Sequence, residues 1–141
     1  MKRIALSLAP LLLLTAPPLA PAAMAATKAA APARIVTVTV VMQDRKFRPQ
    51  VIRLRRDQPT RIVLVNRDVS GHNFSAKGFF SRADIRDTGM GLQAIHEGIV
   101  SVPSTSTRAF VVTPRVRGPF DLKSSVALDV ASGMQGQILV Y

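Results

Sequence analysis

The closing stretch of the chain, from Leu122 to Tyr141, has the arrangement of a metal-binding loop. A strand-like apolar run is followed by a short excursion, a Gly-Met-x-Gly motif at 133–136 and a final apolar run. The thioether of Met134 is a weak, soft ligand, whereas the carboxylate of Asp129 is a hard oxygen donor. Ser124 and Asp129 occupy the positions where such a loop would carry a thiolate and an imidazole. The stretch is therefore a metal site, an altered metal site or the remnant of one.

A second group of candidate ligands, Met90 and His96, lies in a glycine-containing segment in the middle of the chain. These two side chains could close over a soft cation if the segment moves. The adjacent His96 and Glu97 point to different sides of an extended chain, so they cannot both reach one ion without a bend. We favour an exposed loop without a ligand role.

Catalytic motifs are missing from the sequence. It contains no cysteine, no glycine-rich phosphate loop and no recognisable Ser-His-Asp arrangement. Its eight acidic residues form no evident acid–base pair. We therefore expect a protein that is not an enzyme.

Short strands separated by turns account for most of the chain. Ile35 to Met42 is β-branched and alternating, and Val51 to Leu54 alternates apolar residues with arginine. The other predicted strands are 61–66, 98–102, 108–113, 119–123 and 137–141. Residues 71–95 lack a sustained period and are predicted to be loop with a helical turn or two. About seven short strands predict an all-β fold, an antiparallel Greek-key sandwich or barrel over residues 35–141.

The N-terminus has the features of a signal peptide. Lys2 and Arg3 precede an apolar run at 11–14, and Ala23-Met-Ala25 supplies the small residues of a cleavage site. The apolar run is too short and too interrupted by proline to span a bilayer, although an uncleaved anchor is the alternative. We predict a signal peptide at 1–25, a flexible Ala/Pro-rich linker at 26–34, and no transmembrane segment in the mature chain. The predicted location is periplasmic or secreted.

The chain is strongly basic. Its formal net charge is +11, and loss of Lys2 and Arg3 with the signal peptide lowers this to +9. Export, a single tyrosine and the lack of tryptophan argue against nucleic acid as the partner. An acidic periplasmic protein or an anionic envelope surface fits the charge better, and a solvated surface without a dedicated partner is the other interpretation.

Several motifs, taken in order, resemble the cupredoxins. They are Phe47-Arg-Pro49, Val51-Ile-Arg-Leu54, the segment from Asn66 to His72, and Gly133-Met-Gln-Gly136 before the last strand. The resemblance covers about residues 36–141. It is strongest to small periplasmic, plastocyanin-like cupredoxin domains in which a His-Asn-Phe segment precedes a Phe-Phe pair, here 72–74 and 79–80.

The resemblance implies a fold and a set of ligand positions. Copper-binding cupredoxins use a first His, then Cys, His and Met from the last loop, and these positions correspond to His72, Ser124, Asp129 and Met134. A blue-copper site needs the thiolate, because it forms the covalent bond through which the electron leaves. A serine hydroxyl is a poor soft ligand, so fast electron transfer is not expected. His72, Asp129 and Met134 remain as a degenerate metal site for which copper is the candidate cofactor.

Each candidate ligand also has a structural interpretation. His72 could hydrogen-bond a loop carbonyl, and Asp129 could pair with one of the arginines. Ser124 is expected to bond the backbone, and Met134 could be core filler beneath the loop.

We therefore predict an exported cupredoxin-like domain without a complete type-1 copper site that acts as a binding or accessory module of the cell envelope. The alternative is a periplasmic copper-binding or copper-handling protein that uses His72, Asp129 and Met134. A function as an electron carrier is the third and most distant alternative.

Overall fold

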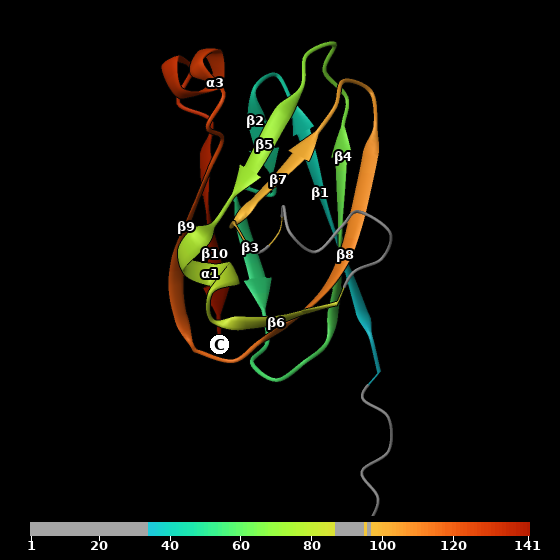
Figure 1. The fold of residues 1–141 in the computed structure, drawn as a ribbon, viewed down its shortest axis with the longest axis vertical. Helices are drawn as coiled ribbons and strands as arrows, with labels where there is room; N and C mark the ends of the chain where they lie inside the picture. The colour runs from blue at the N-terminus through green and yellow to red at the C-terminus, as the bar shows by residue number, and fades with distance from the viewer. Residues whose placement is uncertain (1–33, 87–94, 96) are drawn as a thin grey trace, which may run out of the picture.

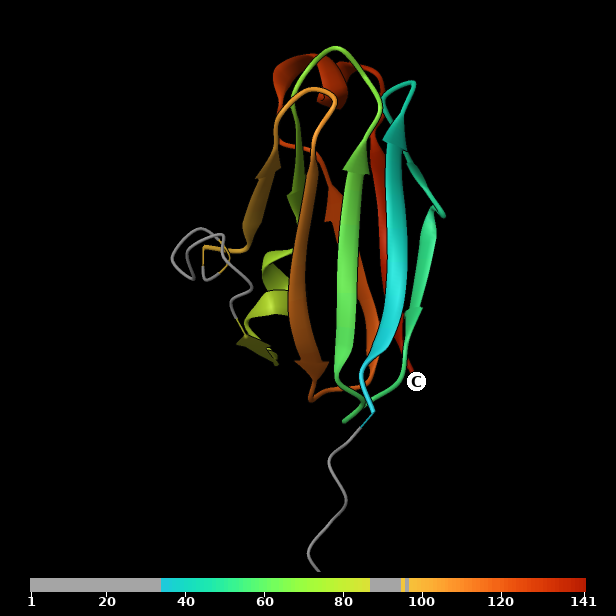
Figure 2. The same cartoon turned by 90° about the vertical axis from the view of Figure 1, so that its right-hand side faces the viewer.

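The computed structural model describes residues 34–86, 95 and 97–141, which fold as two facing β-sheets (Figures 1 and 2). The sheet that begins the chain has the order β2-β1-β4-β8-β6. Its strands are β1 (Val36–Gln43), β2 (Lys46–Arg48), β4 (Thr60–Asn66), β8 (Thr107–Pro114) and β6 (Ala83–Arg86). The second sheet has the order β3-β10-β9-β5-β7. Its strands are β3 (Val51–Leu54), β10 (Gln135–Val140), β9 (Gly118–Lys123), β5 (His72–Ser75) and β7 (Ile99–Val102).

The all-β sandwich predicted from the sequence is confirmed, and the seven predicted strands correspond to β1, β3, β4, β7, β8, β9 and β10. Three further strands, β2, β5 and β6, were missed. Two of them lie in the 71–95 segment that was predicted as loop. The helical turn expected there is α1 (Lys77–Phe80), and a second short helix, α3 (Ala127–Ala131), lies in the last loop. The predicted boundaries at 25 and 34, and the interpretation of residues 1–33, lie outside the described residues.

The prediction of a fully antiparallel sandwich is wrong for two strand pairs. β1 pairs in parallel with β4, and β3 pairs in parallel with β10. The reason is a crossover at Pro49 and Gln50, where the chain leaves one sheet as β2 and continues in the same direction in the other as β3. It then returns as β4, which consequently runs alongside β1 in the same direction.

The alternation of each strand buries one face between the sheets. In β4 the buried residues Ile62 and Leu64 alternate with exposed or half-buried ones, as expected for a strand with one covered face. All six phenylalanines of the chain meet in this core as edge-on or tilted pairs, with ring centroids 5.5 to 6.4 Å apart. Each such contact contributes about 0.5–1.5 kcal/mol beyond area burial. The aromatic cluster therefore fixes α1, which supplies Phe79 and Phe80, against both sheets.

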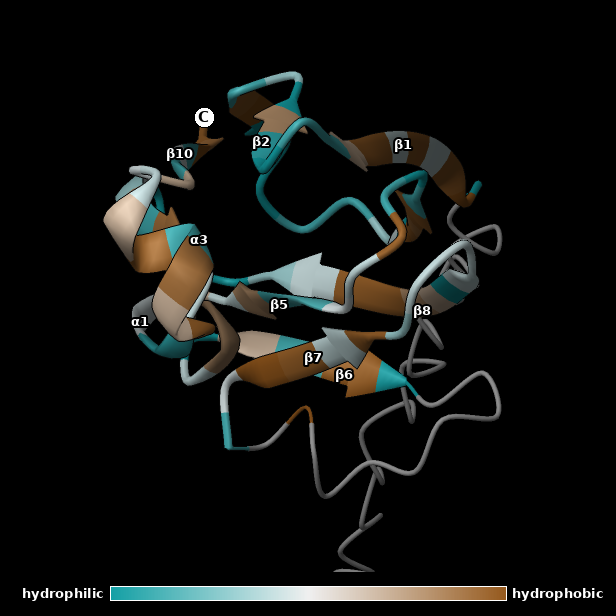
Figure 3. Ribbon diagram, turned by 90° about the horizontal axis from the view of Figure 1, so that it is seen from above, coloured by the Kyte–Doolittle hydropathy of each residue, from teal (hydrophilic) through white to brown (hydrophobic). Residues whose placement is uncertain are grey.

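Four loops meet at one end of the sandwich, the upper end in Figure 1. They are the β1–β2 turn, the β4–β5 loop, the β7–β8 loop and the β9–β10 loop that contains α3. Figure 3 looks down on this end and shows the hydrophobic residues of α3 among hydrophilic loops. In the described part of the chain, no helix is long and apolar enough to cross a membrane.

Candidate functional site

The residues singled out in the sequence come together at this loop end. His72 is the first residue of β5, Ser124 follows the last residue of β9, and Asp129 lies in α3. All three side chains are buried, each only 1% exposed. The fold thus brings His72 next to two residues that lie more than fifty positions later in the chain.

A single carboxylate oxygen joins the three. Oδ2 of Asp129 lies 2.8 Å from Nδ1 of His72 and accepts a hydrogen bond of 2.6 Å from the hydroxyl of Ser124. Asp129 therefore pairs with the histidine, and the predicted pairing with an arginine is wrong. A buried carboxylate requires such partners, because an unpaired buried charge costs several kcal/mol.

The other ring nitrogen of His72 contacts a residue that the sequence analysis did not select. Nε2 of His72 lies 2.8 Å from Oδ2 of Asp68, in the β4–β5 loop. The histidine therefore bonds carboxylates rather than the loop carbonyl suggested as its structural role. We call the four residues His72, Asp68, Asp129 and Ser124 the His72 network.

Asp68 also stabilises the neighbouring β1–β2 turn. Its carboxylate accepts hydrogen bonds from the backbone amides of Asp44 and Arg45, at 3.0 and 3.1 Å. Asp44 and Arg45 have φ values of 55° and 53°, as a two-residue turn of type I′ requires, although Asn or Gly is preferred there. Asp68 therefore connects a strained turn directly to His72.

These contacts determine the ionisation of Asp68. Partial burial opposes ionisation, but the amides of Arg45 and Asp44 and the ring of His72 more than offset it and hold the pKa of Asp68 below its usual value. The carboxylate is thus ionised at neutral pH.

The position of Asp68 is set by Asn66 at the end of β4. The Asn66 side-chain oxygen accepts a hydrogen bond of 2.9 Å from the amide of Asp68. Its NH₂ group lies at hydrogen-bond distance from three carbonyls, those of Ser70, Val102 and Pro103. One side chain therefore holds the β4–β5 and β7–β8 loops together. A sequence signal existed, because Asn66 and Asp68 are short polar residues that follow a buried strand and precede His72.

The geometry limits where the protons can lie. A carboxylate only accepts hydrogen bonds, and both ring nitrogens of His72 face one. With both aspartates ionised, the ring supplies both protons and is an imidazolium between two carboxylates. In that state neither nitrogen has a lone pair for a metal.

Ser124 has the structural role expected from its sequence. Besides donating to Asp129, its oxygen lies 3.3 Å from the backbone amides of Asn73 and Val126, which donate to it. The expectation that Ser124 bonds the backbone is confirmed.

Met134 lies directly before β10, and its side chain belongs to the hydrophobic core. Its backbone carbonyl accepts a bond from the Ser124 amide, and its amide donates to the Asp129 carbonyl. The backbone of Met134 therefore fixes the spacing of Ser124 and Asp129, while its side chain fits the interpretation as core filler.

The network does not fit the copper site that the cupredoxin resemblance implies. A type-1 site requires a thiolate and two neutral imidazoles, whereas this network offers a hydroxyl, two carboxylates and one imidazole whose two nitrogens are both hydrogen-bonded. The two carboxylates also lie on opposite sides of the ring, so one ion cannot contact His72 and both aspartates. Among residues 34–86, 95 and 97–141, no group of three His, Asp or Glu side chains is arranged to hold a metal ion. The second candidate pair, Met90 and His96, lies outside the described residues.

Comparisons with known proteins place the chain by family and by fold. Residues 15–96 match the family model of the cupredoxin-like domain. This match includes His72 but ends before the last loop. No curated protein matches the sequence.

Solved structures with the same fold have low sequence identity to this chain. Auracyanin from the photosynthetic bacterium Roseiflexus castenholzii is 16% identical with a TM-score of 0.55, and the match covers 78% of this chain and 99% of that one. Auracyanin B is 13% identical with a TM-score of 0.54, covering 74% and 88%. A laccase from Pediococcus acidilactici is 17% identical with a TM-score of 0.56, covering 76% of this chain and 27% of the laccase.

These likenesses show a shared fold, and the family model covers more than half of the chain. The chain belongs to the cupredoxin-like domain family.

Proposed function

We propose that this protein is an exported cupredoxin-like domain without a type-1 copper centre that acts as a binding or accessory module of the cell envelope. The observation that carries the proposal is the double engagement of His72, whose two ring nitrogens each lie 2.8 Å from a carboxylate oxygen. An ion pair with Asp129 and Asp68 then takes the structural place of a metal in holding the loops together. The predicted signal peptide at 1–25 supports export.

The test is calorimetric titration of the purified protein with Cu(II) and Zn(II). We expect weak binding or none, because a metal at His72 must displace a proton and break a buried ion pair. Tight binding that His72→Ala abolishes would overturn the proposal and make this a metal protein. Tight binding that survives His72→Ala would instead place a metal at another site.

Copper handling is the second candidate function. Its support is that Oδ2 of Asp129 contacts both Nδ1 of His72 and the hydroxyl of Ser124, so that a deprotonated ring could share Cu(II) with the carboxylate. Met134 would join only if its side chain left the core. Such binding should weaken as the pH falls, because protons compete with the metal for the ring nitrogen, and the basic surface would oppose it further.

Electron transfer needs a thiolate, which the double variant Ser124→Cys/Asp129→His would restore. We expect copper addition to this variant to produce an intense visible absorption band, with Ser124→Cys alone as the control. If no band appears, Ser124 and Asp129 do not correspond to the family's ligand positions.

The partner that we propose is anionic, either an acidic periplasmic protein or an anionic envelope surface, and not nucleic acid. Arg53 and Arg55 support this, because Arg53 is exposed on β3, Arg55 is exposed directly after it, and neither has an ion-pair partner within the described part of the chain. Cosedimentation with phosphatidylglycerol vesicles should be lost in high salt and absent with neutral lipid vesicles. Absence of binding to both vesicle types leaves the acidic protein as the partner.

A further inference from the structure

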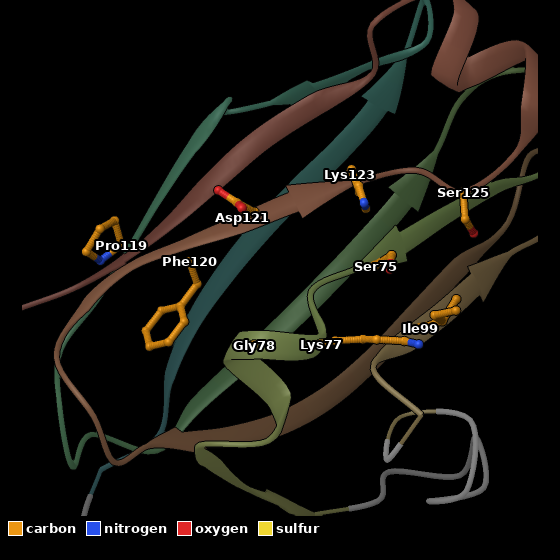
Figure 4. Close-up of a pocket in the computed structure, with 9 residues that line it drawn as sticks. All are labelled: Ser75, Lys77, Gly78, Ile99, Pro119, Phe120, Asp121, Lys123 and Ser125. Atoms are coloured by element: carbon orange, nitrogen blue, oxygen red, sulfur yellow. The ribbon is translucent and has the colours of Figure 1, made fainter.

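A pocket opens on the side of the sandwich where the second sheet separates. β5 and β9 are paired only at Ser75 and Lys123 and then diverge. The helix α1 enters the gap and fills its inner part with the rings of Phe79 and Phe80. The space that remains has a volume of about 510 Å³, which is within the range of small-molecule sites. We call it the α1 pocket, and it is lined by Ser75, Lys77, Gly78, Ile99, Pro119, Phe120, Asp121, Lys123 and Ser125 (Figure 4).

One part of the α1 pocket is apolar and rigid. Pro119, Gly78 and the ring of Phe120 form it, and Phe120 packs edge-on against Phe79 with ring centroids 5.8 Å apart. Gly78 leaves the space open, since the nearest atom to a Cβ built there is Cδ1 of Phe120, at 3.9 Å. This part offers a small apolar surface to a ligand, because Phe120 lines it while remaining only 7% exposed.

The other part is positively charged. Lys77 and Lys123 extend towards the side of the pocket where Ser75 and Ser125 lie, as Figure 4 shows. Neither lysine forms an ion pair with any carboxylate in the described residues. The side chain of Asp121 points away from both. Both lysines line the same pocket, so an anion bound there is attracted by both.

Ser125 adds an oriented hydroxyl group. Its oxygen accepts a hydrogen bond of 2.8 Å from the side-chain amide of Asn73. One of the two acceptor lone pairs of the hydroxyl is thereby occupied, and its proton remains available to donate to an anion. The lysines and the serine together resemble the few polar groups that orient a ligand in an otherwise apolar site.

We propose that the α1 pocket binds a small organic anion with an apolar body. The acid group lies at Lys77, Lys123 and Ser125, and the apolar body lies against Phe120. This site is separate from the His72 network and does not depend on whether that network binds metal.

The test uses three probes on the purified, ¹⁵N-labelled protein. They are 4-phenylbutyrate, the amine with the same apolar body (4-phenylbutylamine), and inorganic phosphate. We expect 4-phenylbutyrate to shift the amide resonances of Ser75, Gly78 and Lys123 saturably. The amine should not do so, and phosphate should bind at least tenfold more weakly because it lacks the apolar body. Equal binding of amine and acid, tighter binding of phosphate, or shifts confined to the loop end near Val69 and Leu128 would each overturn the proposal.

Substitutions then locate the site. Lys77→Gln and Lys123→Gln should each weaken 4-phenylbutyrate binding about tenfold, as expected for one charge-assisted hydrogen bond. Lys46→Gln on β2 makes the same change outside the α1 pocket and should leave binding unchanged. Gly78→Leu keeps both charges but fills the apolar part, and it should abolish binding. Unchanged affinity in all three pocket variants, with the fold intact by circular dichroism, would refute the assignment.

Discussion

The His72 network and the α1 pocket differ in whether their polar groups have partners within the protein. In the described residues, every buried side-chain nitrogen and oxygen atom has a hydrogen-bond partner, and the network accounts for the most deeply buried charges among them. At the α1 pocket, the ammonium groups of Lys77 and Lys123 have no carboxylate partner among the described residues. The first site satisfies its polar groups by contacts within the protein, whereas the second leaves its lysines exposed to solvent.

This difference indicates that the His72 network contributes to folding stability and the α1 pocket to binding. A buried charge without its partner is destabilising, so removing one member of the network should lower the free energy of unfolding. An exposed, unpaired lysine makes no contact that folding depends on, so its removal should affect binding only. Family membership directs attention to the loop end, but the α1 pocket, with two lysines that have no carboxylate partner among the described residues, lies on the side of the sandwich.

The largest expected effect comes from His72→Leu. This change leaves Asp129 buried without its ion-pair partner and should lower the free energy of unfolding by about 3–5 kcal/mol. Urea denaturation followed by circular dichroism measures it. The double variant His72→Leu/Asp129→Leu removes the stranded charge and should be more stable than His72→Leu alone. If the double variant loses the sum of the two single effects, the residues do not interact as the geometry indicates.

Asp68→Asn should have the next largest effect, a decrease of about 2 kcal/mol in the free energy of unfolding at pH 7. The reason is that it weakens the hydrogen bonds from the turn amides and the contact with His72. The pKa of Asp68 is lowered in the folded state, so the stability it contributes is present above its unfolded value of about 3.9 and is lost as the pH falls through the lower folded value. Urea denaturation between pH 2 and pH 7 should therefore show a smaller decrease in acid for Asp68→Asn than for the unsubstituted protein. Asp57, whose pKa is also lowered, provides the control Asp57→Asn, which should retain the contribution of Asp68. An unaltered acid profile in Asp68→Asn would contradict this account.

The sequence was sufficient to predict the sandwich and part of the site. Strands with strict alternation, such as β1 and β4, were found because one face of each is covered. The missed strands β2, β5 and β6 have only three or four residues, and they contain fewer of the β-branched residues by which the equally short β3 and β7 were recognised. The parallel pairs depend on the crossover between β2 and β3, which is a property of the whole topology.

The chemistry of the site could be predicted only in outline. Ser124, Asp129 and His72 were placed near one another by their resemblance to cupredoxin ligand positions, and the structure brings the three together. Asp68 was missed because its contact with His72 depends on how Asn66 folds the intervening loop. That contact decides whether the imidazole has a free nitrogen, so the sequence left open the question that matters most for metal binding.

A smaller effect is expected for Ser124→Ala. The change removes a hydroxyl that donates to Asp129 and accepts from two amides, and the net loss should be about 1–2 kcal/mol. Ser125→Ala, at the neighbouring position, removes one exposed contact with Asn73 and should cost about 0.5 kcal/mol or less. The two variants can be compared in the same urea titration. Equal losses would mean that Ser124 contributes nothing through the His72 network.

The smallest effect on folding is expected at the α1 pocket. Lys77→Gln and Lys123→Gln break no ion pair within the described residues, and each removes one of two like charges. The unfolding free energy should therefore change by less than about 0.5 kcal/mol, and the double variant should be no less stable than either single variant, because mutual repulsion is relieved. Thermal denaturation at low and high salt checks this, since salt screens the repulsion and should remove any gain. A loss comparable with that of His72→Leu would show that the lysines have a structural role and would end the contrast between the two sites.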